Sequence, residues 1–227
     1  MALALLGGLA TQAPARCADL ALVLAIDASG SIDPAEFALQ QRGYAAAFLS
    51  SRVQAALAAT GVVDISAVVW GDTEMSPQVL PWQRLRTVAD AVVLSHRIAG
   101  LQRQVTGNTG IGRGVWTAID LLEAPDRCAY RRLVNVSGDG TETLSPRPRH
   151  HVPLALARAR ADALGITINA LAIQNDTPAL AAWYQTRLIA GPGAFVITVA
   201  GFDSFAEAII ETLAREIGPP AVAGLQP

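Results

Sequence analysis

Charged side chains are scarce in this chain of 227 residues, and lysine is absent. Only 16% of the residues are charged, and the 17 basic residues, all arginine, are balanced by 19 acidic ones. Because the arginines are scattered and the net charge is −2, the sequence has no basic surface of the kind that binds nucleic acid. A hydrophobic fraction of 52% with so small a net charge excludes a disordered chain, and 19 glycines and 13 prolines are too few for a collagen-like one.

Long apolar runs are missing as well. No stretch of 18 or more residues lacks charges and turn formers, so we expect no transmembrane segment and assign the apolar residues to a globular core. A short apolar run, Ala2–Ala10, precedes Ala13-Pro14-Ala15, which has the small-x-small pattern of a signal-peptidase site. Because the usual basic residues before it are absent, residues 1–16 are predicted to be either an export signal or an apolar N-terminal extension. Export would place the chain in the periplasm or outside the cell, with one domain over residues 17–217 and a loose tail over 218–227.

Apolar segments of strand length alternate with helical segments along the predicted domain. Leu20–Ile26 has the continuous apolar pattern of a strand buried on both faces, and Asp33-Pro34-Ala35-Glu36 begins a helix expected to reach about Ala59. The last helix is expected to start from a capping box at Ser204. Further strands are expected at about 62–70, 75–82, 133–137, 166–173 and 194–199, and further helices at about 85–99, 113–123, 153–164, 178–189 and 205–217. This alternation predicts an α/β domain with a doubly wound, mostly parallel six-stranded sheet and helices on both faces.

Polar side chains follow two strands of this predicted sheet. Asp27, Ser29 and Ser31 come directly after the first strand, and Asp139 follows the strand at 133–137. If the strand order is 3-2-1-4-5-6, these two strands are neighbours at the point where the order reverses, where ligands of such sheets bind. Thr109 lies in a glycine-rich loop before a helix whose N-terminus also favours anions.

Two carboxylates and several hydroxyls are the oxygen ligands that a hard divalent cation takes. The alternating spacing of Asp27, Ser29 and Ser31 on a tight loop can turn three side-chain oxygens toward one point. We therefore expect a Mg²⁺ site, with Mn²⁺ or Ca²⁺ as other possible ions. Because serine hydroxyls are neutral ligands, two carboxylates only just balance the ion, which keeps an affinity for an outside anion such as the carboxylate of a partner.

These residues resemble the metal-ion-dependent adhesion site of the von Willebrand factor type A (vWA) domain. The segments ALVLAIDASGS, NVSGDG, GITINALAI and IAGPGAFV resemble more closely a bacterial subfamily of that fold, domain of unknown function 1194, over about residues 17–217. The resemblance implies that Asp27, Ser29, Ser31, Thr109 and Asp139 are the metal-site residues, and that the domain binds an Asp or Glu side chain of a protein or peptide partner without catalysing a reaction. The loop also holds Thr106, but the family spacing favours Thr109. Thr141-Glu142-Thr143 departs from the family pattern, in which acidic and amide residues follow Asp139-Gly140.

Two other functions stay open at this point. The first is a metal-dependent hydrolase or phosphatase that uses Asp27, although a phosphatase of the haloacid dehalogenase type would have a second Asp where Ser29 stands. Ser137 has Asn135 in place of the first glycine of a nucleophile elbow, and no Walker A or dinucleotide fingerprint opens the first helix. The second is a scaffold subunit whose site stays empty.

The two cysteines occupy matching positions before these strands. Cys17 lies ten residues before Asp27, and Cys128 lies eleven before Asp139. If the two strands are adjacent and parallel, both cysteines sit at the same level at the opposite edge of the sheet, within reach of a disulfide. We therefore predict a Cys17–Cys128 disulfide.

Overall fold

The computed structural model describes residues 17–219, except 147 and 176. The predicted export signal or extension over residues 1–16 therefore lies outside the described residues, as does the expected loose tail from residue 220 onward. The elements are β1 (Ala18–Asp27), α1 (Pro34–Leu49), α2 (Ser51–Thr60), β2 (Val63–Trp70), β3 (Gln78–Leu85), α3 (Val88–Ala99), α4 (Ile111–Leu122), β4 (Ala129–Gly138), α5 (Leu154–Leu164), β5 (Thr167–Ile173), α6 (Leu180–Arg187), β6 (Val196–Val199), the 3₁₀ turn η1 (Phe202–Ser204) and α7 (Phe205–Ile217).

The strands described here form one six-stranded sheet with the order β3-β2-β1-β4-β5-β6. Only β3 runs antiparallel to its neighbour, and the other adjacent pairs are parallel. The predicted doubly wound, mostly parallel sheet is therefore confirmed. The central strands β1 and β2 are buried almost throughout, because helices cover both faces.

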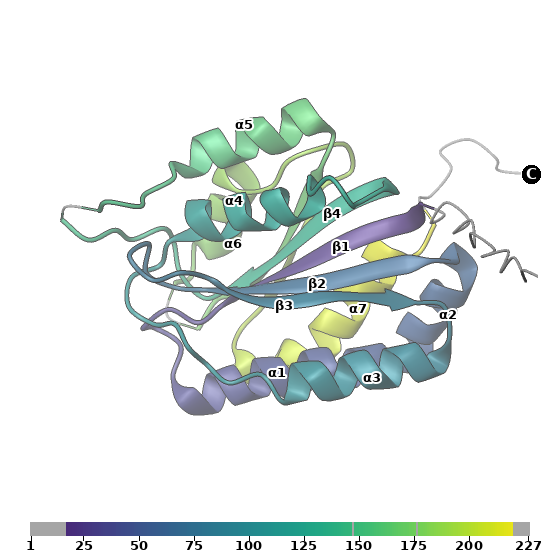
Figure 1. Ribbon diagram of the computed structural model, residues 1–227. Coiled ribbons are helices and arrows are strands. Elements are labelled where there is room, and N and C mark those ends of the chain that lie inside the picture. The colour runs from purple at the N-terminus through teal and green to yellow at the C-terminus, as the bar shows by residue number, and fades with distance from the viewer. Residues whose placement is uncertain (1–16, 147, 176, 220–227) are drawn as a thin grey trace, which may run out of the picture.

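Helices form one layer on each face of the sheet (Figure 1). One layer holds α1, α2, α3 and α7, and α1 contacts both α3 and α7. The other holds α4, α5 and α6. Each layer packs on its own apolar core, one around Tyr44 and Phe48 and the other around Val115 and Tyr184. The loops that follow the parallel strands gather at the left end of the sheet in Figure 1, opposite the start of β1. Among the described helices, none has the length and apolarity needed to cross a membrane.

Three local predictions were wrong. The helix expected to run unbroken to about Ala59 divides at Ser50, whose backbone is extended and whose side chain caps α2 by accepting from the Val53 N–H. The capping box predicted at Ser204 is absent, because the η1 turn already holds that residue in a helical conformation. The third strand begins at Gln78, not Met75, because a longer loop follows β2.

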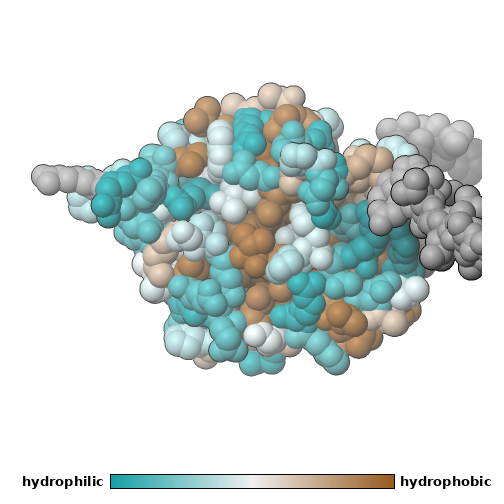
Figure 2. All heavy atoms as spheres, viewed as in Figure 1, coloured by the Kyte–Doolittle hydropathy of each residue, from teal (hydrophilic) through white to brown (hydrophobic). Residues whose placement is uncertain are grey.

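The edge strand β3 lies on the face shown in Figure 2, where apolar residues run down the middle between the two helical layers. Val79 of this strand is 40% exposed. An open strand edge invites pairing with another chain. Here Pro81 has no N–H to donate, and the guanidinium of Arg97 donates to its carbonyl at 3.0 Å, so this part of the edge is protected.

The predicted disulfide is present between Cys17 and Cys128. Ala18 pairs with Ala129 in the β1–β4 ladder, so the residues just before them stand side by side with a Cα–Cα separation of 4.7 Å. The strand register therefore brings together two cysteines that are 111 positions apart in the sequence.

A buried polar network ties α7 to the sheet. Glu216 on α7 is 1% exposed, and its Oε1 accepts from Asn135 at 3.0 Å and from Asn169 at 3.1 Å. The Tyr44 hydroxyl donates to Asn135, and Arg131 donates to the backbone carbonyl of Glu216. Burial raises the pKa of Glu216 to about 7, although the two amides and the charge of Arg131 oppose this shift.

Replacement of Glu216 by glutamine should therefore change how stability depends on pH. From the ordinary value of 4.5 up to about 7, the folded protein holds a proton that the unfolded chain has released, so its free energy of unfolding falls as pH rises through this interval. The Glu216→Gln variant cannot titrate here. The free energy of unfolding of the wild type minus that of the variant should decrease by about 3 kcal/mol between about pH 4 and about pH 8.

Urea unfolding across this pH range measures the difference directly. Glu207→Gln on the exposed side of α7 is the matched control and should leave the pH profile unchanged. Parallel profiles for the wild type and Glu216→Gln would show that Glu216 does not carry this pH dependence.

Candidate metal centre

All five residues predicted for the metal site lie at the carboxyl edge of the sheet. Asp27 ends β1, and Ser29 and Ser31 follow in the turn that leads to α1. Asp139 follows β4, the strand beside β1. Thr109 comes from the loop before α4. Three loops that are distant in the sequence thus meet where the strand order reverses.

The side-chain oxygens of Ser29, Ser31, Thr109 and Asp139 are joined by direct contacts. The Ser31 hydroxyl donates to Asp139 Oδ1 at 2.7 Å, and the hydroxyl oxygens of Ser29 and Ser31 are 3.2 Å apart. The Thr109 hydroxyl donates to Ser29 Oγ at 3.2 Å. The hydroxyl of Thr106, the other threonine of that loop, instead accepts from Arg103.

Asp27 is the most deeply buried member of the cluster, with no exposed surface. Its Oδ1 accepts from the Ser29 N–H at 2.8 Å, while its buried Oδ2 has no hydrogen-bond partner among the described residues. Burial raises the pKa of Asp27 to about 7; the Ser29 N–H opposes this rise and the charge of Asp139 adds to it. A buried carboxylate with one unpaired oxygen is costly unless a cation balances it. The donor set therefore fits a divalent cation.

Glycine at position 138 gives the Asp27 carboxylate its space. A Cβ at this position would lie 2.9 Å from Asp27 Oδ2 and 2.7 Å from the Tyr184 hydroxyl. That hydroxyl donates to the carbonyl of Gly140 at 3.1 Å and so fixes the turn that carries Asp139.

Sequence reasoning missed the side chains that hold the first loop. Gln40 on α1 donates to the Asp27 carbonyl at 3.0 Å and accepts from Ser137 at 3.1 Å. Arg103 donates to the carbonyls of Ala28 and Ser29, each at 2.8 Å. A glutamine on the apolar side of a helix was the available signal for Gln40, but the sequence has no local feature that connects Arg103 with this loop.

The loop after Asp139 is built differently from the family pattern, and its residues support the site. The Thr109 N–H donates to the Thr143 hydroxyl at 2.9 Å, and the Thr143 N–H donates to the Thr109 carbonyl at 3.0 Å. The Glu142 carboxylate accepts from the N–H of Gly112 at 2.9 Å and from the N–H of Leu154, so it caps α4 and α5 together. Burial raises the pKa of Glu142, and these N–H groups oppose the shift. Glu142 therefore caps two helix N-termini.

Within the part of the chain that the structure describes, no group of three or more His, Cys, Asp or Glu side chains is arranged to hold a metal ion. The cluster described above has two carboxylates and three hydroxyls, so it depends on neutral oxygens for the remainder of its donor set.

Several solved structures share this fold. The pilus adhesin SpaC from Lactobacillus rhamnosus GG is 12% identical with a TM-score of 0.63, and the match covers 91% of this chain and 31% of the adhesin. The vWF domain of the type V pili tip protein Mfa5 from Porphyromonas gingivalis is 14% identical with a TM-score of 0.59, over 92% of this chain and 99% of that domain. Proximal thread matrix protein 1 of the mussel byssus, with a zinc-occupied MIDAS motif, is 16% identical with a TM-score of 0.57, over 87% of this chain and 45% of that one.

At the level of sequence, the chain matches a protein-family model. No curated protein sequence matches the chain. The model described as "Protein of unknown function (DUF1194)" matches residues 16–221. The expected resemblance is confirmed: the chain belongs to the DUF1194 family, and its fold is that of a von Willebrand factor type A domain.

Proposed function

We propose that this domain binds a protein or peptide partner through a divalent cation held by Asp27, Ser29, Ser31, Thr109 and Asp139. The observation that carries this proposal is the contact between hydroxyl and carboxylate oxygens from three separate loops, next to the unpaired Oδ2 of Asp27. Mg²⁺ is the proposed ion, with Mn²⁺ and Ca²⁺ as other oxygen-preferring candidates.

The charge balance favours an acidic partner. Two carboxylates neutralise a divalent ion, and three neutral hydroxyls add no further negative charge, so a bound ion retains affinity for an anionic ligand. An Asp or Glu side chain of the partner supplies such a ligand. The fold shared with a pilus adhesin and a pili tip protein supports an adhesion-type role for the domain.

Exposure to the extracellular or periplasmic space is part of the same proposal. The Cys17–Cys128 disulfide favours an oxidising compartment. We assign residues 1–16 to an export signal or apolar extension, 17–217 to the binding domain and 218–227 to a tail.

Binding of defined peptides tests the role of the carboxylate. Blocked pentapeptides with a central Asp or Glu between glycines, which carry no apolar side chain, should bind the Mg²⁺-loaded protein. Their Asn and Gln counterparts should bind at least about tenfold more weakly, because a charge-assisted ligand is lost. EDTA should remove the difference, and so should Asp139→Asn, whereas Asp203→Asn on the exposed η1 turn should preserve it. Fluorescence polarisation measures each affinity.

Two outcomes would overturn the proposal. One is peptide binding that is equal for acidic and amide peptides and indifferent to EDTA. The other is metal-dependent hydrolysis of phosphate or ester substrates that Asp27→Ala abolishes in folded protein, since this would make Asp27 part of a hydrolase.

A further inference from the structure

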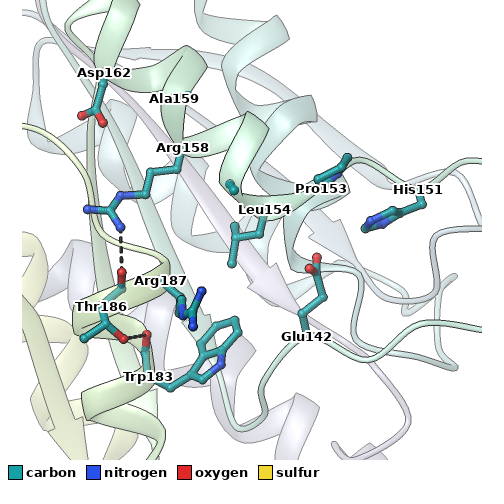
Figure 3. Close-up of a pocket in the computed structure, with 11 residues that line it drawn as sticks. Glu142, His151, Pro153, Leu154, Arg158, Ala159, Asp162, Trp183, Thr186 and Arg187 are labelled. Atoms are coloured by element: carbon teal, nitrogen blue, oxygen red, sulfur yellow. Dashed lines mark hydrogen bonds between the residues drawn. The ribbon is translucent and has the colours of Figure 1, made fainter.

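A pocket of about 650 Å³ lies between α5, α6 and the loop after β4 (Figure 3). Glu142 and His151, both from the loop between β4 and α5, line one side of the pocket. Trp183 and Arg187 of α6 line the opposite side. Glu142 follows Asp139 by three residues, so the pocket and the metal centre share one loop.

The floor of the pocket is apolar. Leu154 points into it from the first turn of α5, facing the indole of Trp183, which is half-buried (Figure 3). An aromatic ring beside an aliphatic side chain offers contact area to an apolar group of a ligand.

Among the charged groups around this floor, the basic side chains have few hydrogen-bond partners, whereas Glu142 is already engaged. Arg158 donates one N–H to the Thr186 carbonyl at 2.7 Å, which leaves most of its five N–H groups for other acceptors. Arg187 forms no hydrogen bond or ion pair with any described residue. The buried Nδ1 of His151 also lacks a hydrogen-bond partner among them. Of the two acids in the lining, Glu142 is engaged by the N-termini of α4 and α5, and Asp162 stands one turn beyond Arg158 at the far end.

We propose that this pocket binds a second acidic residue of the protein partner, together with an apolar residue next to it. The guanidinium of Arg187 and the remaining N–H groups of Arg158 match the planar geometry of a carboxylate, and Leu154 and Trp183 contact the apolar neighbour. The identity of the occupant rests on the proposed function, since the same acidic segment would place its other carboxylate at the metal centre.

The indole N–H signal of Trp183 in a ¹⁵N-labelled sample reports on the pocket itself. The probe is the blocked peptide acetyl-Leu-Glu-Leu-Glu-amide, with acetyl-Leu-Gln-Leu-Gln-amide as its neutral counterpart. Titration with the acidic peptide should shift this signal to saturation, both in Mg²⁺ and in EDTA, because the pocket needs no metal. The neutral peptide should bind about tenfold more weakly.

Two arginine variants, one on α6 inside the pocket and one on α5 outside it, distinguish binding in the pocket from a general effect of charge. Arg187→Gln should lower the affinity for the acidic peptide about tenfold. Arg160→Gln is the matched control, because Arg160 on α5 faces Trp116 and pairs with Asp120, away from the pocket, and it should leave the affinity unchanged. Trp183→Phe identifies the signal.

The outcomes distinguish this inference from the metal proposal. A saturable Trp183 shift in EDTA supports the pocket whether the metal-bridged function passes or fails its own test with the pentapeptides. An unchanged Trp183 signal, or equal affinity for the acidic and neutral peptides, overturns the pocket while leaving the metal centre to its own test.

Discussion

The Asp27→Asn variant should lose nearly all affinity for Mg²⁺ while remaining folded. Asp27 is an anionic oxygen donor with no exposed surface, and an amide supplies no negative charge to balance a cation. We expect the affinity to fall more than about 100-fold, beyond the effect of losing a residue that merely orients a ligand. Because burial disfavours the charged carboxylate, the amide should not destabilise the metal-free protein.

Thermal unfolding with and without Mg²⁺ and calorimetric titration measure this effect. A cation that binds only the folded state raises the free energy of unfolding by about 2.7 kcal/mol at a concentration of 100 times its Kd. The wild type and the exposed control Asp203→Asn should show this gain, and Asp27→Asn should not.

Thr109 provides a graded comparison. Thr109→Ala removes one neutral oxygen that water can replace, so it should lower the affinity for Mg²⁺ less than Asp27→Asn does. Thr109→Ser should retain the affinity because it keeps the hydroxyl. Equal Mg²⁺ binding by the wild type and Asp27→Asn would remove Asp27 from the site.

Loss of the Cys17–Cys128 disulfide should produce the second large effect, on stability. The disulfide closes a loop with a sequence separation of 111, and cross-linking a loop of about this length lowers the entropy of the unfolded chain. The free energy of unfolding should fall by about 4 to 5 kcal/mol in the Cys17→Ser/Cys128→Ser double variant.

Reduction of the wild type is the internal control. Cys128 is exposed, so dithiothreitol should reach the disulfide and shift the urea midpoint of the wild type to that of the double variant. The double variant itself should not respond to the reductant. A wild-type midpoint that is unchanged by dithiothreitol, with two free thiols counted, would contradict a stabilising role.

The helix boundaries illustrate where sequence patterns were sufficient and where they failed. The cap at Asp33 formed as predicted, because Asp33, Pro34 and Glu36 interact within one turn. The end of that helix was misplaced, because nothing in an alanine-rich run indicates that Ser50 will leave the helical conformation and cap α2. At Ser204 the motif was present, but the preceding η1 turn made it ineffective.

The sequence by itself determined the alternation of strands and helices, the carboxylates that follow two of the strands and the spacing of each cysteine before its carboxylate, whereas the strand order was a condition that the structure met. These follow from apolar periodicity and from counting residues along strands, which have a regular rise. Asp27, Ser29 and Ser31 were identifiable as candidate ligands because they stand at every second position of one loop.

Only the tertiary structure decided which side chains the candidate ligands contact and which distant groups support their loops. It brought Thr109 against Ser29, placed Gln40 and Arg103 on the carbonyls of the first loop and directed Glu142 to two helix ends. Such contacts join loops and helices whose relative positions depend on packing across the whole core, and a hydrogen bond between them requires positions within a few tenths of an ångström. No local pattern encodes that precision, because each of these side chains could equally face solvent in a different packing arrangement.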